Sequence, residues 1–174
     1  RGFGYNIRVP LEPTTRRHEV DIYLDVARAL HLDTTDALPT MPISGDVAAS
    51  VRALRHTHGL HTPYFVVNPS GGKNPGSRMD EKRYPPEQLA TVLNTIGPAL
   101  GVRQVAVVAG PGDDMLAGRI LAGLHGLDAT TFVGSLTFPQ VGALARDAVG
   151  YIGNDTGLTH IAAAAGARTV MILG

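Results

Sequence analysis

From residue 63 onward, short apolar runs alternate with helical stretches, and this alternation constrains the fold more than any other feature of the chain. The apolar runs predict strands at residues 64–67, 104–108, 130–133, 150–152 and 169–173. Helices are predicted between them, at residues 86–97, 114–124, 138–147 and 157–165. Strands that are apolar on both faces and separated by helices belong to parallel sheets, so the pattern predicts an α/β fold with helices on both faces of a parallel sheet.

The first third of the chain reads differently. Residues 19–30 place Val20, Tyr23, Leu24, Ala27 and Leu30 at helical spacing, which predicts an amphipathic helix. Residues 31–45 carry prolines and turn formers and read as a linker. A second helix is predicted at about residues 46–57, with Ser44 or Gly45 as its cap. We therefore expect two parts, residues 1–45 and residues 46–174.

Composition excludes several classes of protein. Hydrophobic residues make up 44% and charged residues 17% of the 174 residues, as in globular proteins. Lys plus Arg equals Asp plus Glu, 15 each, which argues against a nucleic-acid partner. Cysteine is absent, so disulfides and thiolate metal sites are excluded and a cytoplasmic location is compatible. The sequence holds no apolar run of the roughly 20 residues that an integral membrane segment needs.

Both ends of the sequence read as cut. The chain opens on RGFGYNIRVP, without an initiator Met, and closes on TVMILG, which reads as a strand ending in Gly. We expect a piece of a longer protein.

The segment GNDTGLTHIAAAAG, residues 153–166, runs from a polar knot into an alanine-rich helix. Asp155 or Thr156 can simply cap this helix. Alternatively, Gly157 lets a ligand approach the free N–H groups of the helix N-terminus, which suit a phosphate, and His160 adds a donor one turn on. Asp155 would then accept from a sugar hydroxyl or a backbone amide. An aspartic protease also carries Asp-Thr-Gly, but in a β-loop and as one of a pair, whereas here a helix follows and no second copy exists.

Two further loops follow predicted strands. AGPGDD, residues 109–114, fails the dinucleotide fingerprint at Met115; Asp113 as a helix cap and Asp114 as a ligand of a ribose or sugar hydroxyl remain equally open. The loop at residues 68–85 is no P-loop, yet it carries the cations Lys73, Arg78, Lys82 and Arg83, so it is either a solvated loop or a diphosphate site. Ligands of parallel sheets bind at the carboxyl ends of the strands, where all these loops would gather.

Three histidines, His56, His58 and His61, cluster near the end of the second predicted helix. Because no carboxylate accompanies them at ligand spacing, solvated imidazoles are favoured over a metal site. We expect neither a metal nor a cofactor.

Together these segments resemble glycosyltransferase family 9, the ADP-heptose:lipopolysaccharide heptosyltransferases. The match to its Asp-Thr-Gly block is the specific part, and it comprises Asp155, Thr156, Gly157, His160, Ala162–Ala164, Gly166 and Gly174. Lys82–Arg83–Tyr84–Pro85 is similar to the family's Lys-x-Trp-Pro, with Tyr in place of Trp. VVNPSGG, Gly110 with Asp114, GSLTFPQVGAL and HEVDIYLDVARALHL extend the resemblance over nearly all of the chain.

The resemblance implies a GT-B fold, in which two Rossmann-like domains face a cleft. Residues 1–45 would be a bridging segment and linker from an amino-terminal acceptor domain that this sequence lacks. Residues 46–174 would be the nucleotide-sugar-binding, Rossmann-like donor domain, truncated at its carboxyl end.

The resemblance also implies roles for single residues of the donor site. Ser70, Gly71 and Lys82 would contact the diphosphate, and Thr156, Gly157 and His160 would hold phosphate oxygens. Asp155 would hydrogen-bond the heptose, Asp114 the ribose, and Leu136 would lie against the adenine.

The implied reaction transfers a sugar from a nucleotide-diphosphate donor, expected to be ADP-heptose, to a lipopolysaccharide-type or other glycan or lipid-linked acceptor, with inversion. The catalytic base would lie in the amino-terminal domain, so we expect this chain alone to be inactive. The implied location is cytoplasmic, at the inner face of the membrane, with peripheral contact through the absent domain. A GT-B-type nucleotide-sugar epimerase and a non-catalytic nucleotide-sugar-binding module remain alternatives.

Overall fold

The computed structural model describes residues 6–9, 17–71, 73–74, 77–78, 80 and 83–173, and the chain divides into two compact units after Pro39. The first unit contains helix α1 (Glu19–Ala29), which confirms the predicted first helix and buries none of its residues. Arg17 and Arg28 both bond the carboxylate of Asp25, and these hydrogen bonds hold the pKa of Asp25 below its usual value.

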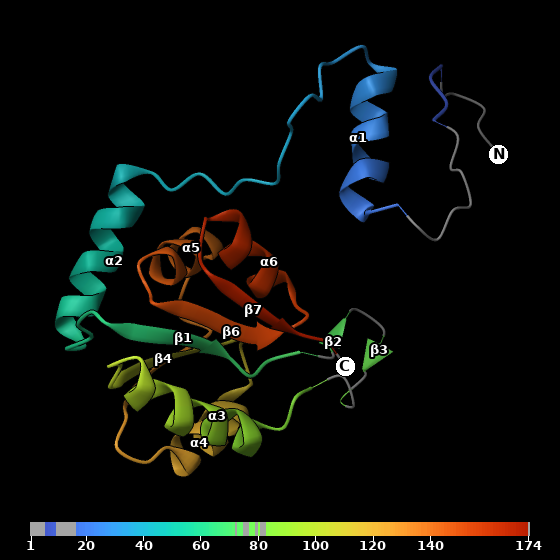
Figure 1. Cartoon of the computed structure of the whole chain (residues 1–174). Coiled ribbons are helices and arrows are strands. Elements are labelled where there is room, and N and C mark those ends of the chain that lie inside the picture. The colour runs from blue at the N-terminus through green and yellow to red at the C-terminus, as the bar shows by residue number, and fades with distance from the viewer. Residues whose placement is uncertain are drawn as a thin grey trace. The chain divides into compact units, whose positions relative to one another are not determined.

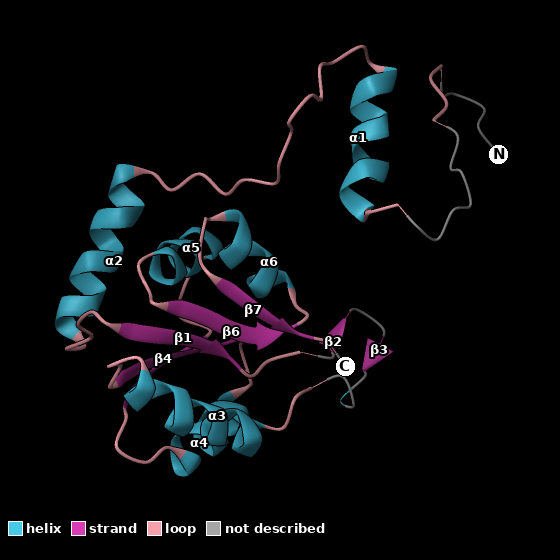
Figure 2. Cartoon of the chain, in the orientation of Figure 1, coloured by secondary structure: helices cyan, strands magenta, loops and turns pink. Residues whose placement is uncertain are grey.

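The second unit is built on a five-stranded, wholly parallel sheet in the order β5-β4-β1-β6-β7 (Figures 1 and 2). Its strands are β1 (Tyr64–Asn68), β4 (Gln104–Ala109), β5 (Asp128–Val133), β6 (Gly150–Asn154) and β7 (Thr169–Ile172). Every predicted strand is confirmed to within about two residues at each end. Strand β6 reaches Asn154 because its last residues pair with β7, Asn154 opposite Ile172.

Helices cover both faces of this sheet, as predicted (Figure 1). One face carries α2 (Gly45–Thr57), α5 (Phe138–Arg146) and α6 (Gly157–Ala164), and the other carries α3 (Pro86–Ala99) and α4 (Asp114–Gly123). Ser44 caps α2 by accepting a hydrogen bond from the backbone N–H of Val47. The fold class is therefore confirmed: a Rossmann-like α/β domain.

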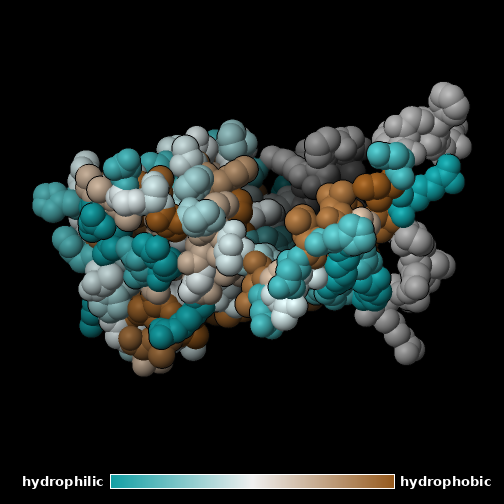
Figure 3. Space-filling view, turned by 90° about the horizontal axis from the view of Figure 1, so that it is seen from above, coloured by the Kyte–Doolittle hydropathy of each residue, from teal (hydrophilic) through white to brown (hydrophobic). Residues whose placement is uncertain are grey.

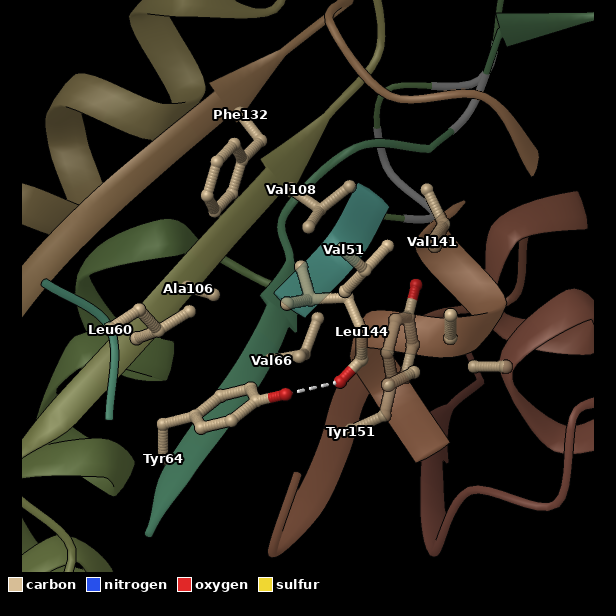
Figure 4. Packing of buried hydrophobic residues seen from close by; sticks show 13 residues of the cluster. Val51, Leu60, Tyr64, Val66, Ala106, Val108, Phe132, Val141, Leu144 and Tyr151 are labelled. Carbon is tan, nitrogen blue, oxygen red and sulfur yellow. Dashed lines mark hydrogen bonds between the residues drawn. The ribbon is translucent and has the colours of Figure 1, made fainter. Parts of the chain in front are cut away.

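Each face of the sheet has its own hydrophobic core. Under α2 and α5, Val51 and Leu144 pack against Val66 and Tyr151 of the sheet (Figure 4). The buried Tyr64 hydroxyl donates to the Leu144 carbonyl at 2.7 Å, and burial raises the pKa of Tyr64. Tyr64 and Val66 occupy alternate positions of β1, so the side chain between them points to the opposite face of the sheet.

The second core lies under α3 and α4. Leu89 and Leu93 of α3 pack with Ile120 of α4 against the other side of the same strands. The two helices approach so closely that a Cβ atom on Gly123 would lie 2.8 Å from the Cβ of Ala90. With both faces covered, the edge formed by the carboxyl ends of the strands is the part of the sheet left for a ligand.

A short antiparallel hairpin, β2 (Lys73–Asn74) and β3 (Ser77–Arg78), lies between β1 and α3. It was expected only as a loop, because two-residue strands carry no periodic signal.

Among the described residues, no helix is both long and apolar enough to cross a bilayer. The face in Figure 3 mixes hydrophobic residues in brown with hydrophilic ones in teal.

Candidate functional site

A cavity of about 350 Å³ opens at the carboxyl edge of the sheet. The loops after β1, β4 and β6 and the first turns of α5 and α6 supply its walls. The described residues that line it are Asn68, Ser70, Gly71, Gly110, Asp113, Phe138, Thr156, Gly157, Leu158 and Ile161. Its place matches the ligand position expected for a parallel α/β sheet.

Asn68, the last residue of β1, shapes one side of the polar wall. Its Oδ1 accepts from the backbone N–H of Ser70 at 2.9 Å, and its Nδ2 donates to the Thr156 hydroxyl at 3.1 Å. Asn68 is fully buried, so both ends of its amide need partners within the protein. The side chain thereby joins the loop after β1 to the N-cap residue of α6.

Asn154, the last residue of β6, does the same from the neighbouring strand. Its Nδ2 donates to the carbonyls of Pro69 and Ser70, at 3.1 and 3.0 Å, and its Oδ1 accepts from the backbone N–H of Tyr84 at 3.0 Å. The carbonyl of Asn154 accepts from the Thr159 hydroxyl at 2.6 Å, which anchors the first turn of α6.

The loop after β4 joins this network at Gly110. The backbone N–H of Gly110 donates to the Ser70 hydroxyl at 3.1 Å. Beyond Gly110 the chain turns at Gly112, whose φ of +79° lies in the left-handed region that favours glycine. The turn leaves Asp113 buried at 7% exposure, against the cavity, and Asp114 exposed as the first residue of α4.

Gly153 is closely packed, and any side chain there would have to displace its neighbours. A Cβ atom there would lie 3.0 Å from the Thr159 hydroxyl oxygen and from Cε1 of Tyr151, and 3.1 Å from the Cβ of Asn68. This glycine therefore lets the two asparagine-bearing strand ends and α6 come together beneath the cavity.

The remaining wall of the cavity is apolar. Phe138, the first residue of α5, is 62% exposed, and Leu158 and Ile161 lie one turn apart on α6. Gln140 fixes the start of α5, because its Oε1 accepts from the backbone N–H of Thr137 at 2.9 Å. The cavity thus combines a hydrogen-bonded polar wall with an apolar wall that carries an aromatic ring.

Four of the residues proposed for the site from sequence line this cavity: Ser70, Gly71, Thr156 and Gly157. Asp155 and His160 are exposed beside it, with Oδ1 of Asp155 and Nε2 of His160 3.3 Å apart. Leu136 is half-buried and packs against the core under α5. Lys82 and Gly174 lie outside the described residues.

Sequence reasoning missed Asn68, Asp113, Phe138, Leu158 and Ile161 as lining residues. For Asn68 a signal existed, since a polar residue ending an apolar strand at the carboxyl edge is placed for a ligand or for the loop. The sequence could not show whether Leu136 or Phe138 lines the site. The answer depends on the residue at which α5 begins, and that residue is Phe138.

A second cavity of about 400 Å³ lies beside the segment that leads into α3, and Arg83 and Arg119 contribute to its lining. Arg83 serves the first cavity as well, because its Nε donates to the Gly71 carbonyl at 2.7 Å. Arg119 is paired with Glu87, whose pKa this hydrogen bonding lowers. In the described part of the chain, no three His, Cys, Asp or Glu side chains gather in a group that could hold a metal ion.

The chain is similar to known heptosyltransferases. The family model described as glycosyltransferase family 9 (heptosyltransferase) matches residues 2–174. Lipopolysaccharide heptosyltransferase 3 of Escherichia coli K12 is 29% identical over 168 residues, which are 94% of this chain and 46% of that protein. The chain therefore spans less than half the length of this curated relative.

Two solved structures share the fold. The glycosyl transferase family 9 protein from Veillonella parvula superposes with a TM-score of 0.77 at 22% identity, covering 93% of this chain and 44% of its own. The ADP-heptose lps heptosyltransferase II of E. coli gives a TM-score of 0.63 at 21% identity, covering 82% of this chain and 42% of its own.

Proposed function

The chain belongs to glycosyltransferase family 9, and from this premise we propose that it is the donor-binding part of a glycosyltransferase. The donor is a nucleotide-diphosphate sugar, ADP-heptose, and the acceptor is a lipopolysaccharide-type or other glycan. Residues 1–45 bridge to an acceptor domain, and residues 46–174 bind the donor. The enzyme acts in the cytoplasm at the inner face of the membrane, which it contacts peripherally through the acceptor domain.

The observation that carries this proposal is the two-sided character of the cavity at the carboxyl edge. A nucleotide sugar has a charged diphosphate between a planar base and a polyhydroxylated sugar. The polar wall, with Gly157 at the N-terminus of α6, suits the diphosphate. The exposed ring of Phe138 with Leu158 and Ile161 suits the planar base.

The individual roles follow from the family motifs together with the cavity. Ser70, Gly71 and Lys82 contact the diphosphate, while Thr156, Gly157 and His160 hold phosphate oxygens. Asp155, exposed beside the cavity next to His160, binds the sugar. The ribose belongs to the loop after β4, where Asp114 matches the motif and Asp113 lines the cavity. The adenine belongs to the segment before α5, where Leu136 matches the motif and Phe138 lines the cavity.

The proposed chemistry is a direct displacement that inverts the anomeric carbon. The acceptor hydroxyl gives its proton to a carboxylate and forms the new C–O bond, while the bond to the diphosphate breaks and the nucleotide diphosphate leaves. Donors aimed at the diphosphate stabilise the negative charge that develops on it. The base is supplied by the acceptor domain, so the chain alone binds donor and transfers little sugar.

A ligand screen tests the proposal. Thermal shift with ADP-, UDP-, GDP- and TDP-sugars should raise the melting temperature with the ADP compounds, because a ligand that binds only the folded state stabilises it. If UDP bound and ADP did not, ADP-heptose would be rejected as the donor. If no nucleotide bound, the proposed nucleotide-sugar site would be rejected. Conversion of a nucleotide sugar to its isomer without an acceptor would favour an epimerase.

A further inference from the structure

We propose that Asn154 is a positioning residue that prepares the cavity for an anion by turning two backbone carbonyls away from it. The anion is the donor diphosphate, so this part of the inference rests on the proposed function. The hydrogen bonds that carry the inference are independent of any ligand.

Both donors and the acceptor oxygen of the Asn154 side-chain amide have hydrogen-bond partners. The two protons of Nδ2 go to the carbonyls of Pro69 and Ser70, and Oδ1 receives the backbone N–H of Tyr84. The residue is only 2% exposed, so water cannot replace these partners without rearrangement.

The two carbonyls matter because of where they lie in the chain. Ser70 and Gly71 line the cavity, and a carbonyl oxygen facing a phosphate would repel it through its partial negative charge. Hydrogen bonds to Nδ2 direct the carbonyls of Pro69 and Ser70 toward a buried amide instead. The cavity surface of this loop is thereby left to groups that tolerate or attract an anion.

Asn154 also couples this loop to the N-terminus of α6. The Thr159 hydroxyl donates to the Asn154 carbonyl, and Asn68 links the Ser70 N–H to the Thr156 hydroxyl. Gly71 packs on the same side chain, since a Cβ there would lie 3.3 Å from the Cβ of Asn154. The loop after β1 and the first turn of α6 therefore hold one fixed relative position.

Only a side chain with two donors and one acceptor at this point makes all three bonds. Aspartate has nearly the same shape but offers only acceptors when ionised, and it would face two carbonyl oxygens. Asn154→Asp thus removes both donors, adds a negative charge beside the proposed anion site, and should release the carbonyls of Pro69 and Ser70. Asn154→Ser keeps one donor and adds no charge.

The chain offers a matched control. Asn94 of α3 also bridges backbone groups far away in sequence, because its Nδ2 donates to the Gly123 carbonyl at 2.8 Å and its Oδ1 accepts from the His125 N–H at 2.9 Å. It does not line the cavity. Asn94→Asp therefore carries the same chemical change without the proposed consequence for an anion.

The experiment measures ADP affinity by calorimetry on the 174-residue chain and its variants. We expect Asn154→Asp to weaken ADP at least tenfold, Asn154→Ser to lie between it and the parent, and Asn94→Asp to stay within twofold of the parent. Equal affinity of the parent and Asn154→Asp would overturn the inference, as would an equal loss in Asn94→Asp.

Amide hydrogen exchange on the ligand-free chain keeps the inference separate from the proposed function. Asn154→Asp, or Asn154→Ser if the first variant does not fold, should speed exchange at Ser70, whose N–H shares a peptide unit with the released Pro69 carbonyl, while leaving His125 unchanged. If the parent chain binds no ADP, the proposed function fails, yet this result still decides the positioning role. Unchanged exchange at Ser70 overturns it.

Discussion

The loops that follow β6 and β4 reach the same cavity from the two strands that flank β1, but they are held in different ways. The loop after β6 follows Gly153 and Asn154, the two buried residues that end the strand, and Asn154 bonds three backbone groups from other segments. The loop after β4 bonds the loop after β1 from the Gly110 N–H to the Ser70 hydroxyl, and it turns on the left-handed Gly112. The first segment is held by the buried Asn154 side chain, whereas in the second a left-handed turn places Asp113 against the cavity.

This difference decides how each loop should respond to substitution. A loop fixed by buried contacts should lose stability and ligand binding together when those contacts change. In a loop that is set mainly by a backbone turn, a substitution should mainly remove the function of the side chain that is replaced.

Gly153→Ala tests the fixed loop and should have the largest effect. The added methyl group meets Thr159, Tyr151 and Asn68 at 3.0 to 3.1 Å, so the strand ends must move apart. We expect unfolding free energy to fall by about 1–3 kcal/mol, the usual cost of overpacking, with loss of ADP binding. Urea unfolding and calorimetry measure both.

The same substitution at Gly118 serves as its control. Gly118 is exposed within α4, and an added Cβ there meets nothing within 4 Å. Gly118→Ala should stabilise the chain by about 0.5–1 kcal/mol through helix propensity and leave ADP binding alone. Equal stability of the Gly153 and Gly118 variants would show that the loop after β6 yields without cost.

Asp113→Asn and Asp114→Asn test the loop after β4. The Asp113 side chain lines the cavity and Asp114 is exposed, so we expect Asp113→Asn to weaken ADP about tenfold or more, the loss typical of a hydrogen bond to a charged group, and Asp114→Asn to stay within about twofold. Calorimetry at constant salt measures both. The reverse order would assign the ribose to Asp114, as the family motif does.

Ser70→Ala tests the bond that joins the loop after β4 to the loop after β1. It leaves the Gly110 N–H without its acceptor, and we expect a loss of about 1 kcal/mol in unfolding free energy. Faster amide exchange at Gly110, with exchange at Tyr84 unchanged, would locate the effect in the loop after β4. Faster exchange at both sites would mean that the loop after β4 is coupled to the segment bonded by Asn154 more strongly than this bond suggests.

His160→Ala should have a small effect on ADP binding and hardly any on stability. The His160 side chain is 66% exposed and its Nε2 lies near the Asp155 carboxylate, so it adds one donor at the border of the site. We expect ADP affinity to fall several-fold and unfolding free energy to stay within about 0.5 kcal/mol of the parent, as for surface substitutions. Equal ADP binding would remove His160 from the proposed site.

The contrast between the loops also explains what could be predicted from the sequence. Periodicity located the strands and helices, and the rule for parallel sheets brought Ser70, Gly71, Thr156 and Gly157 to one edge. It could not separate Asp113 from Asp114, since the φ of Gly112 decides which of the two carboxylates turns inward.

The asparagine contacts were out of reach for a different reason. Asn154 forms hydrogen bonds with Pro69, Ser70 and Tyr84, which lie 85, 84 and 70 residues away in sequence. A local sequence pattern does not predict partners at such separations. Whether Leu136 or Phe138 lines the cavity depends on where α5 begins. The hydrogen bond from the Thr137 N–H to Gln140 fixes that start.

The apolar wall of the cavity has a consequence for redesign. Phe138 and Leu158 stand on the first turns of α5 and α6, and neither takes part in the bonds of Asn68 or Asn154. A library randomised at these two positions would vary the shape offered to a nucleobase while the anchored strand ends stay as they are. The domain is thereby suited to directed evolution toward other sugar nucleotides.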